Sequence, residues 1–127
     1  MIFNGGDHEQ RWEEAVWTAG AVRDDGSIKA DFGASLYILT GIPSAYNRIW
    51  PHIHCGYIDF EPILDAGLSA GEHILVSLAG NLYNGGFFDR FTPLDVVSLC
   101  DADGIELATQ ALLLRKRRLR ITREGVR

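Results

Sequence analysis

Residues 69–86 constrain the fold most, because they carry the start, the body and the end of one amphipathic helix. Ser69 and Glu72 have the spacing of a capping box, in which each side chain accepts a hydrogen bond from the other residue's backbone N–H. Gly85 and Gly86 follow where a left-handed backbone ends a helix. Apolar residues at helical spacing define one face: Ile74, Leu75, Leu78, Ala79, Leu82 and Tyr83. The opposite, polar face holds His73, Ser77, Gly80, Asn81 and Asn84.

Glycine and proline residues divide the rest of the chain into further helices. We predict them over residues 7–19, 31–40, 43–50, 92–100 and from 103 into the basic C-terminal end. Residues 37–40 alone would suit a strand equally well, and their helical context favours a helix. The expected N-terminal caps are Asp7, Thr92 and Asp103. On the last helix we expect Ile105, Ala108, Ala111 and Leu112 to face inward.

Strand signals are nearly absent, because no long alternating β-branched run occurs. The sequence therefore predicts an all-α fold: a compact single-domain bundle of about six helices, some of them short. We expect a helical domain over residues 1–118 and a basic C-terminal tail over 119–127.

The length of 127 residues fits one domain with a core of its own. No apolar run approaches the roughly 18 residues that a membrane-spanning helix needs, so we expect no membrane protein. The first seven residues lack the basic and apolar regions of a signal peptide, so none is expected. Cys55 and Cys100 have no tight spacing, which favours reduced thiols in the cytoplasm.

The net charge of −5 is unevenly distributed along the chain. Residues 1–114 contain five basic and sixteen acidic residues, a net charge of −11. Residues 115–127 contain seven basic residues and one acidic residue, a net charge of +6. Such asymmetry is typical of a nucleic-acid arm, of contact with an acidic partner, or of a solvated end.

Three segments carry a resemblance to known proteins. Residues 36–40 read LYILT, residues 78–86 read LAGNLYNGG after the 69–72 cap, and residues 106–112 lead into Arg115 and Lys116. In this order they resemble a family of small helical bacterial proteins of unknown function, often encoded near mobile elements, as in mobile gene cassettes. The resemblance covers about residues 7–118 and implies a helical fold. It implies no activity, cofactor or catalytic residue, and residues 52–55 have no counterpart in it.

His52 and His54 are the weak metal candidates, because in an extended segment their imidazoles would share one side. A metal would need further ligands such as Asp59, Glu61 or His73, and no metal-binding motif supplies them. The alternative is a loop with polar side chains, and we expect no metal and no cofactor.

Catalytic motifs are also missing. Cys55 follows His54, but adjacent residues rarely present their side chains to each other, and Cys100 follows an apolar run typical of a buried thiol. The paired acids at 13–14 and 24–25 fit a solvated surface. No catalytic residue is assigned, which favours a protein without enzymatic activity.

Aromatic and basic residues are the candidate binding groups. Phe87 and Phe88 follow a double glycine and either form a contact loop or pack into the bundle. Trp17 lies off the predicted buried stripe of its helix. The basic candidates are Arg115, Lys116, Arg117, Arg118 and Arg120, which suit a solvated helix end, an acidic protein face or nucleic-acid phosphates.

These features favour a cytoplasmic, non-enzymatic helical module that acts by protein–protein contact, either as a homo-oligomer or with another protein. The first alternative is nucleic-acid binding through the basic segment. The second is a small-molecule or metal-dependent pocket that uses His52, His54 or His73.

Overall fold

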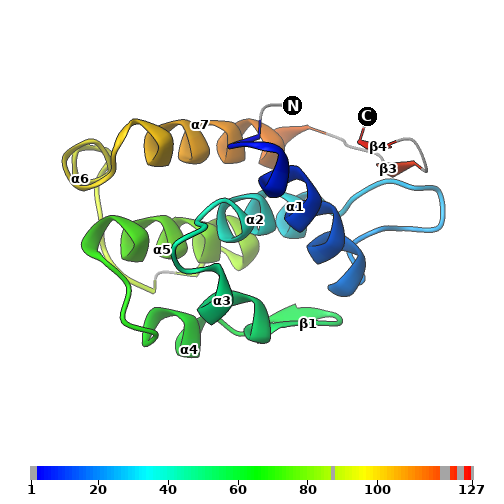
Figure 1. Cartoon of the computed structure of the whole chain (residues 1–127), viewed down its shortest axis with the longest axis horizontal. Helices are drawn as coiled ribbons and strands as arrows, with labels where there is room; N and C mark the ends of the chain where they lie inside the picture. Colours follow the sequence, from blue (N-terminus) through cyan, green and yellow to red (C-terminus); the bar gives the residue numbers. More distant parts are fainter. Residues whose placement is uncertain (1–2, 87, 118–120, 123–124, 127) are drawn as a thin grey trace.

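A helix buried on all sides, α2 (Ala30–Thr40), forms the centre of the protein (Figure 1). Each of its residues from Phe32 to Thr40 is buried. Three helices cover it: α1 (Gly6–Thr18), α5 (Ala70–Asn84) and α7 (Ala102–Lys116). A helix enclosed in this way is apolar around its whole circumference, as the sequence of α2 is.

The computed structural model describes residues 3–86, 88–117, 121–122 and 125–126. This part of the chain contains seven α-helices and two small antiparallel hairpins. The remaining helical elements are α3 (Tyr46–Ile49), the 3₁₀-helix η1 (Trp50–His52), α4 (Phe60–Leu64) and α6 (Pro93–Leu99). The strands are β1 (Ile53–His54), β2 (Tyr57–Ile58), β3 (Ile121–Thr122) and β4 (Gly125–Val126). The mostly helical class is thus confirmed, with one helix more than the expected six.

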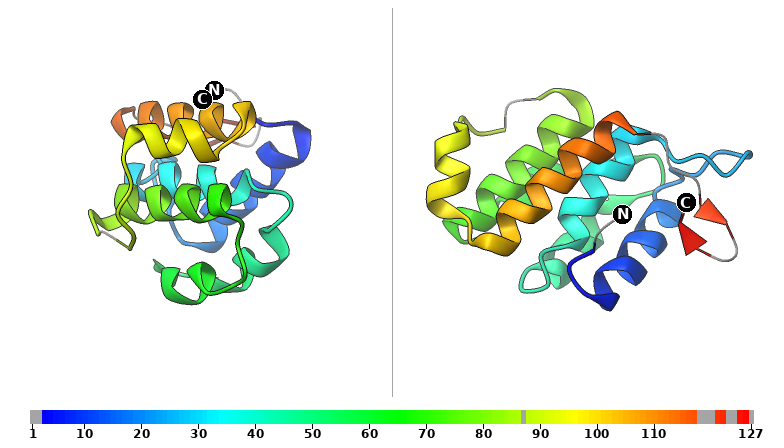
Figure 2. Two further views of the ribbon diagram at one scale, coloured as in Figure 1. Left: turned by 90° about the vertical axis from the view of Figure 1, so that its left-hand side faces the viewer. Right: turned by 90° about the horizontal axis from the view of Figure 1, so that it is seen from above.

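The elements lie in three levels in Figure 1. Helix α7 lies above α2 and α5, while α3, α4 and the β1–β2 hairpin lie below them. Seen from above, α5, α2 and α1 lie side by side, and α7 lies over α5 and α2 (Figure 2). No helix in the described part of the chain is both long enough and apolar enough to cross a membrane.

The capping box of α5 is present as predicted. The backbone N–H of Glu72 donates to Ser69 Oγ at 3.2 Å, and the N–H of Ser69 donates to Glu72 Oε1 at 2.8 Å. Gly85 closes the same helix with a left-handed φ of 77°. Thr92 caps α6 in the same way, with Asp95 as its partner.

Two predicted caps are wrong. The N-cap of α1 is Gly5, two residues before Asp7, so Asp7 lies inside the first turn, where its carboxylate interacts favourably with the helix dipole. Helix α7 is capped by Asp101, whose Oδ1 accepts from the N–H of Gly104 at 2.8 Å. Asp103 therefore lies within the first turn of α7 and does not cap it.

The inward face of α7 also differs from the prediction. Leu107, Ala108, Ala111 and Leu114 are buried, whereas Leu112 is 54% exposed. Apolar residues lie on several sides of this helix, so the spacing alone does not define its buried face. Packing against α2 and α5 selects it.

Part of the polar face of α5 is covered by the chain that follows it. Ser77 and Gly80 are both buried. The chain that follows α5 turns back over this face, and Phe88 packs against Gly80 and stacks on Phe60 with ring centroids 5.2 Å apart.

The segment around His52 and His54 forms a short hairpin. Ile53 pairs with Ile58, and His54 pairs with Tyr57. Gly56 makes the turn with a φ of 90°, a conformation that favours glycine. The sequence contains no strand signal here because each strand has only two residues.

Candidate functional site

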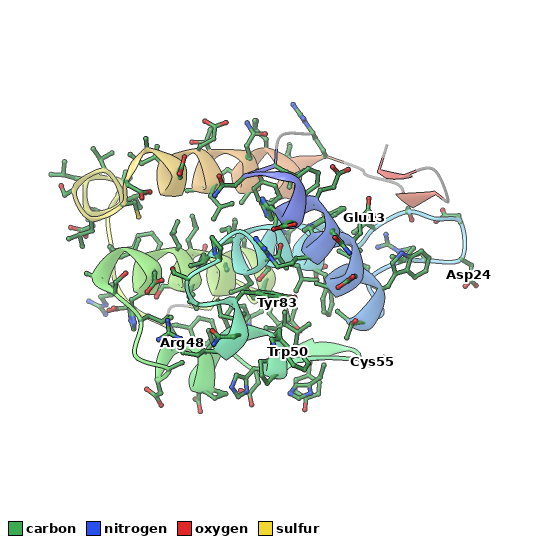
Figure 3. All side chains as sticks on the ribbon, in the orientation of Figure 1. Glu13, Asp24, Arg48, Trp50, Cys55 and Tyr83 are labelled. Carbon is green, nitrogen blue, oxygen red and sulfur yellow. The ribbon has the colours of Figure 1, made fainter. Side chains whose placement is uncertain are left out.

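Three large aromatic side chains are more than half exposed at one corner of the fold. Trp17 is 59% exposed, Trp50 57% and Tyr57 52%. They come from the last turn of α1, from η1 and from β2, and we call them the aromatic corner. The elements meet there because the N–H of Gly56 donates to the backbone oxygen of Ala19 at 2.9 Å. Figure 3 shows Trp50 and Cys55 along this edge.

A groove of about 370 Å³ lies beside Trp50, between α1 and the α3–η1 segment. Ala15 and Ile53 contribute apolar lining, and Tyr46 lies against the guanidinium of Arg11 at 5.4 Å from its ring centroid. Glu14 is the charged residue among the described residues that line the groove. The groove is thus partly apolar, with the acidic Glu14 in its lining and the basic Arg11 against its Tyr46 wall.

Local structure explains why these rings face outward. Ile49 and Ile53 on either side of η1 are buried, which leaves the intervening Trp50 at the surface. Tyr57 stacks on His54 with ring centroids 4.7 Å apart, which holds both rings on one side of the hairpin. Of these three residues, the sequence pattern indicates Trp17 as a binding residue but neither Trp50 nor Tyr57. The position of Trp50 before Pro51, outside any apolar stripe, was the available signal.

The histidines predicted as metal candidates do not form a cluster. His73 lies on α5 and pairs with Asp89, with 3.0 Å between Nε2 and Oδ2. His54 stacks on Tyr57, and His52 ends η1. Among the described residues, no three histidine, cysteine, aspartate or glutamate side chains are placed to hold a metal ion.

His8 is buried and has a structural role. Its Nδ1 accepts from the N–H of Asn4, and its Nε2 donates to the backbone oxygen of Tyr37, both at 2.8 Å. Burial, opposed by the hydrogen bond to Tyr37 and aided by the charge of Arg11, lowers the pKa of His8 to about 4. The ring is therefore neutral at pH 7.

Both cysteines are free thiols. Cys55 is exposed at the hairpin turn. Cys100 is half-buried and donates from Sγ to the backbone oxygen of Gly71 at 3.7 Å. Burial, helped by the charge of Asp101, raises the pKa of the Cys100 thiol. This keeps Cys100 in its unreactive thiol form.

The basic segment is only partly available for binding. Arg115 donates from Nε to the backbone oxygen of Leu82 at 2.8 Å, so it satisfies a carbonyl near the C-terminal end of α5. Lys116 and Arg117 are exposed. Arg118 and Arg120, like Phe87, lie outside the described residues.

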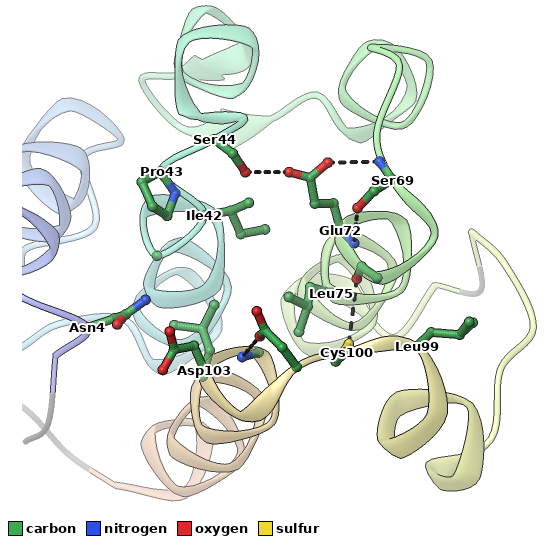
Figure 4. Close-up of a pocket in the computed structure, with 15 residues that line it drawn as sticks. Asn4, Ile42, Pro43, Ser44, Ser69, Glu72, Leu75, Leu99, Cys100 and Asp103 are labelled. Atoms are coloured by element: carbon green, nitrogen blue, oxygen red, sulfur yellow. Dashed lines mark hydrogen bonds between the residues drawn. The ribbon is translucent and has the colours of Figure 1, made fainter.

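A second groove, of about 380 Å³, lies where the N-terminal ends of α5 and α7 meet the 41–44 turn (Figure 4). Glu72 accepts from Ser44 Oγ at 2.6 Å and from the N–H of Ser69 at 2.8 Å. The bond from Ser44, followed by those from Ser69, lowers the pKa of Glu72. The carboxylates of Glu72 and Asp101 thus both bind groups of their own chain, and both cap the helices that border this groove.

Comparison with protein-family models, with curated proteins and with solved structures finds no match for this chain. The resemblance to small bacterial proteins encoded near mobile elements therefore stays a prediction.

Proposed function

We propose that this protein is a non-enzymatic interaction module that binds a second copy of itself through the aromatic corner. The observation that carries the proposal is the exposure of Trp17, Trp50 and Tyr57 at a single junction of elements. Tryptophan and tyrosine supply much of the binding energy at protein interfaces. A monomer leaves more than half of the surface of each of these three residues in water, and an interface would bury that apolar area.

Charge favours a second copy as the occupant. Residues 1–114 carry a net charge of −11, and residues 115–127 carry +6. Lys116 and Arg117 are exposed at the end of α7, and Glu14 lines the groove beside Trp50. The basic end of one copy thus carries the charge opposite to that of residues 1–114 of another. A second copy can bind at the aromatic corner without any other protein. The competing hypothesis is that another protein with a basic, apolar segment binds there.

We also propose a cytoplasmic location and a bacterial source. Cys55 and Cys100 are both free, as expected for a reducing compartment. The bacterial source and the link to mobile elements rest on the resemblance of residues 36–40, 69–86 and 106–116.

The oligomeric state tests the proposal. Size exclusion with light scattering over a concentration series should detect a dimer or larger assembly that dissociates at high salt. The double variant Trp17→Ser/Trp50→Ser should shift the equilibrium to the monomer. Leu94→Ser is the matched control, because Leu94 on α6 is 69% exposed and lies away from the corner. A monomer at every concentration would overturn self-association, and equal effects of both variants would overturn the assigned surface.

Nucleic-acid binding is the second candidate, favoured by the exposed cations of Lys116 and Arg117. It predicts that the logarithm of the binding constant, measured by filter binding, falls linearly with the logarithm of the salt concentration. The slope should be about one per phosphate contact. Lys116→Glu/Arg117→Glu should lower that slope, whereas Trp17→Ser/Trp50→Ser should leave it unchanged. Because the rest of the surface is acidic and repels a duplex, self-association is the better supported function.

A further inference from the structure

The chain after α5 crosses back over the polar face of that helix and is fixed to it at both ends. Near the end of α5, Asn81 Nδ2 donates to the backbone oxygen of Gly86 at 3.1 Å. Near its start, His73 Nε2 lies 3.0 Å from Asp89 Oδ2. The two contacts hold the segment across the helix and leave a space between them.

That space is a pocket of about 630 Å³, which lies within the range of small-molecule sites in proteins. Leu78 and Phe91 give it an apolar wall. Ser77 lies on its α5 side, and Asp89 and Arg90 line it from the crossing segment. It is larger than the two grooves described above, of about 380 and 370 Å³.

Ser77 carries a hydroxyl group that has no partner. Its side chain is 1% exposed, and its Oγ makes no hydrogen bond within the described part of the chain. Buried hydroxyl groups are nearly always hydrogen-bonded, so each exception needs an explanation. Ser35 on α2 is a second such group among the described residues, but Ser35 is not part of the lining of this pocket. Ser77 is also one of the residues that line the pocket, so a ligand there would supply the partner that its buried hydroxyl lacks.

The free hydrogen-bond donors at the pocket are on Arg90. Both carboxylate oxygens of Asp89 have partners, because Oδ2 lies 3.0 Å from His73 Nε2 and Oδ1 accepts from the backbone N–H of Arg90 at 2.8 Å. The guanidinium of Arg90 makes no ion pair or hydrogen bond with the described residues, and it is at the exposed side of the pocket. A guanidinium binds a carboxylate through two parallel hydrogen bonds.

We propose that this pocket binds a small carboxylic acid with an apolar body. Its carboxylate meets Arg90 and accepts a hydrogen bond from the hydroxyl of Ser77. Its apolar body lies against Leu78 and Phe91. The site is independent of the aromatic corner, because it lies on α5 and the segment that follows.

Calorimetric titration with phenylacetate and hexanoate tests whether the pocket binds such acids. Phenylacetamide, the uncharged analogue of phenylacetate, is the control ligand. We expect phenylacetate to bind at least ten times more tightly than phenylacetamide, since charge-assisted hydrogen bonds are worth about ten-fold or more. Arg90→Gln should abolish that preference. Ser77→Ala should lower the affinity for phenylacetate by about three- to ten-fold, which is the contribution of one hydrogen bond.

Ser35→Ala is the matched control for Ser77→Ala, because it removes the other unpartnered buried hydroxyl away from the pocket. Both variants should retain the circular-dichroism spectrum and the melting temperature, or raise the latter. Only Ser77→Ala should change binding. Failure of both acids to bind, equal binding of acid and amide, or equal effects of the two serine variants would overturn the proposal.

Discussion

His8 donates from Nε2 to the backbone oxygen of Tyr37 across 2.8 Å, and this hydrogen bond ties α1 to the buried helix α2. Nδ1 of the same ring accepts from the N–H of Asn4, so the two contacts together require the neutral ring with its proton on Nε2. A protonated ring would lose the contact to Asn4 and would place a charge in the core.

Acid should therefore destabilise the protein through His8. Its pKa is about 4 in the folded chain and 6.5 in the unfolded chain. The contribution of His8 is fully present above pH 6.5 and is lost as the pH falls from there toward 4, because only the unfolded chain takes up the proton in that range. The free energy of unfolding should fall by up to about 1.4 kcal/mol per pH unit, as measured by urea denaturation.

Two variants isolate this effect. His8→Gln should be less stable at pH 7 and should lose this part of the pH dependence. His54→Gln is the control, because His54 is at the surface hairpin, and it should keep the pH dependence. A slope that is unchanged in His8→Gln would contradict the assignment.

Gly41 should not tolerate a side chain. A Cβ at this position would overlap Cδ1 of Leu107 and would lie 3.0 Å from the ring of His8. Gly41→Ala should lower the free energy of unfolding by about 1–3 kcal/mol, the usual cost of overpacking a core. Gly6→Ala is the control, since a Cβ there meets nothing within 4 Å. Equal stability of the two variants in urea would contradict this packing.

The N-cap of α5 should contribute measurably to stability. Ser69→Ala removes the acceptor for the N–H of Glu72 and should cost about 1 kcal/mol in the free energy of unfolding. Ser98→Ala on α6 is the control, because Ser98 is exposed and caps no helix. If both variants melt at the same temperature, the capping box does not stabilise the fold.

The two thiols should react at very different rates. Cys55 is exposed, whereas burial raises the pKa of the half-buried Cys100. A chromogenic disulfide reagent should label one thiol at least ten times faster than the other at pH 7.5. Cys55→Ser should remove the fast phase and Cys100→Ser the slow one. A fast phase that survives in Cys55→Ser would contradict the burial of Cys100.

Local signals predicted the elements whose ends are determined by short-range chemistry. The caps at Ser69 and Thr92 and the stop at Gly85 depend on residues within one turn, so they are visible in the sequence. The predicted N-cap of α7, Asp103, is wrong because Asp101 and Asp103 are both aspartates and either can cap a helix. Only the path of the backbone selects Asp101.

Features that depend on distant packing were not visible. Helix α4 has five residues, too few to show a helical period. Trp50 and Tyr57 form the aromatic corner only because a hairpin contacts the end of α1. The pocket at Ser77 exists because a later segment covers a face whose residues alone suggest exposure to water. Of the candidate residues, the sequence located Trp17 and His73 but not the partners around them.

The enclosure of α2 has a consequence for how this chain can vary. Each residue from Phe32 to Thr40 must suit neighbours on several helices at once, so a change in one needs compensating changes in more than one partner. The aromatic corner and the Ser77 pocket use residues outside α2. Related chains are therefore free to exchange their binding surfaces while they keep the same central helix, and divergence in partner or ligand should leave α2 the least altered segment.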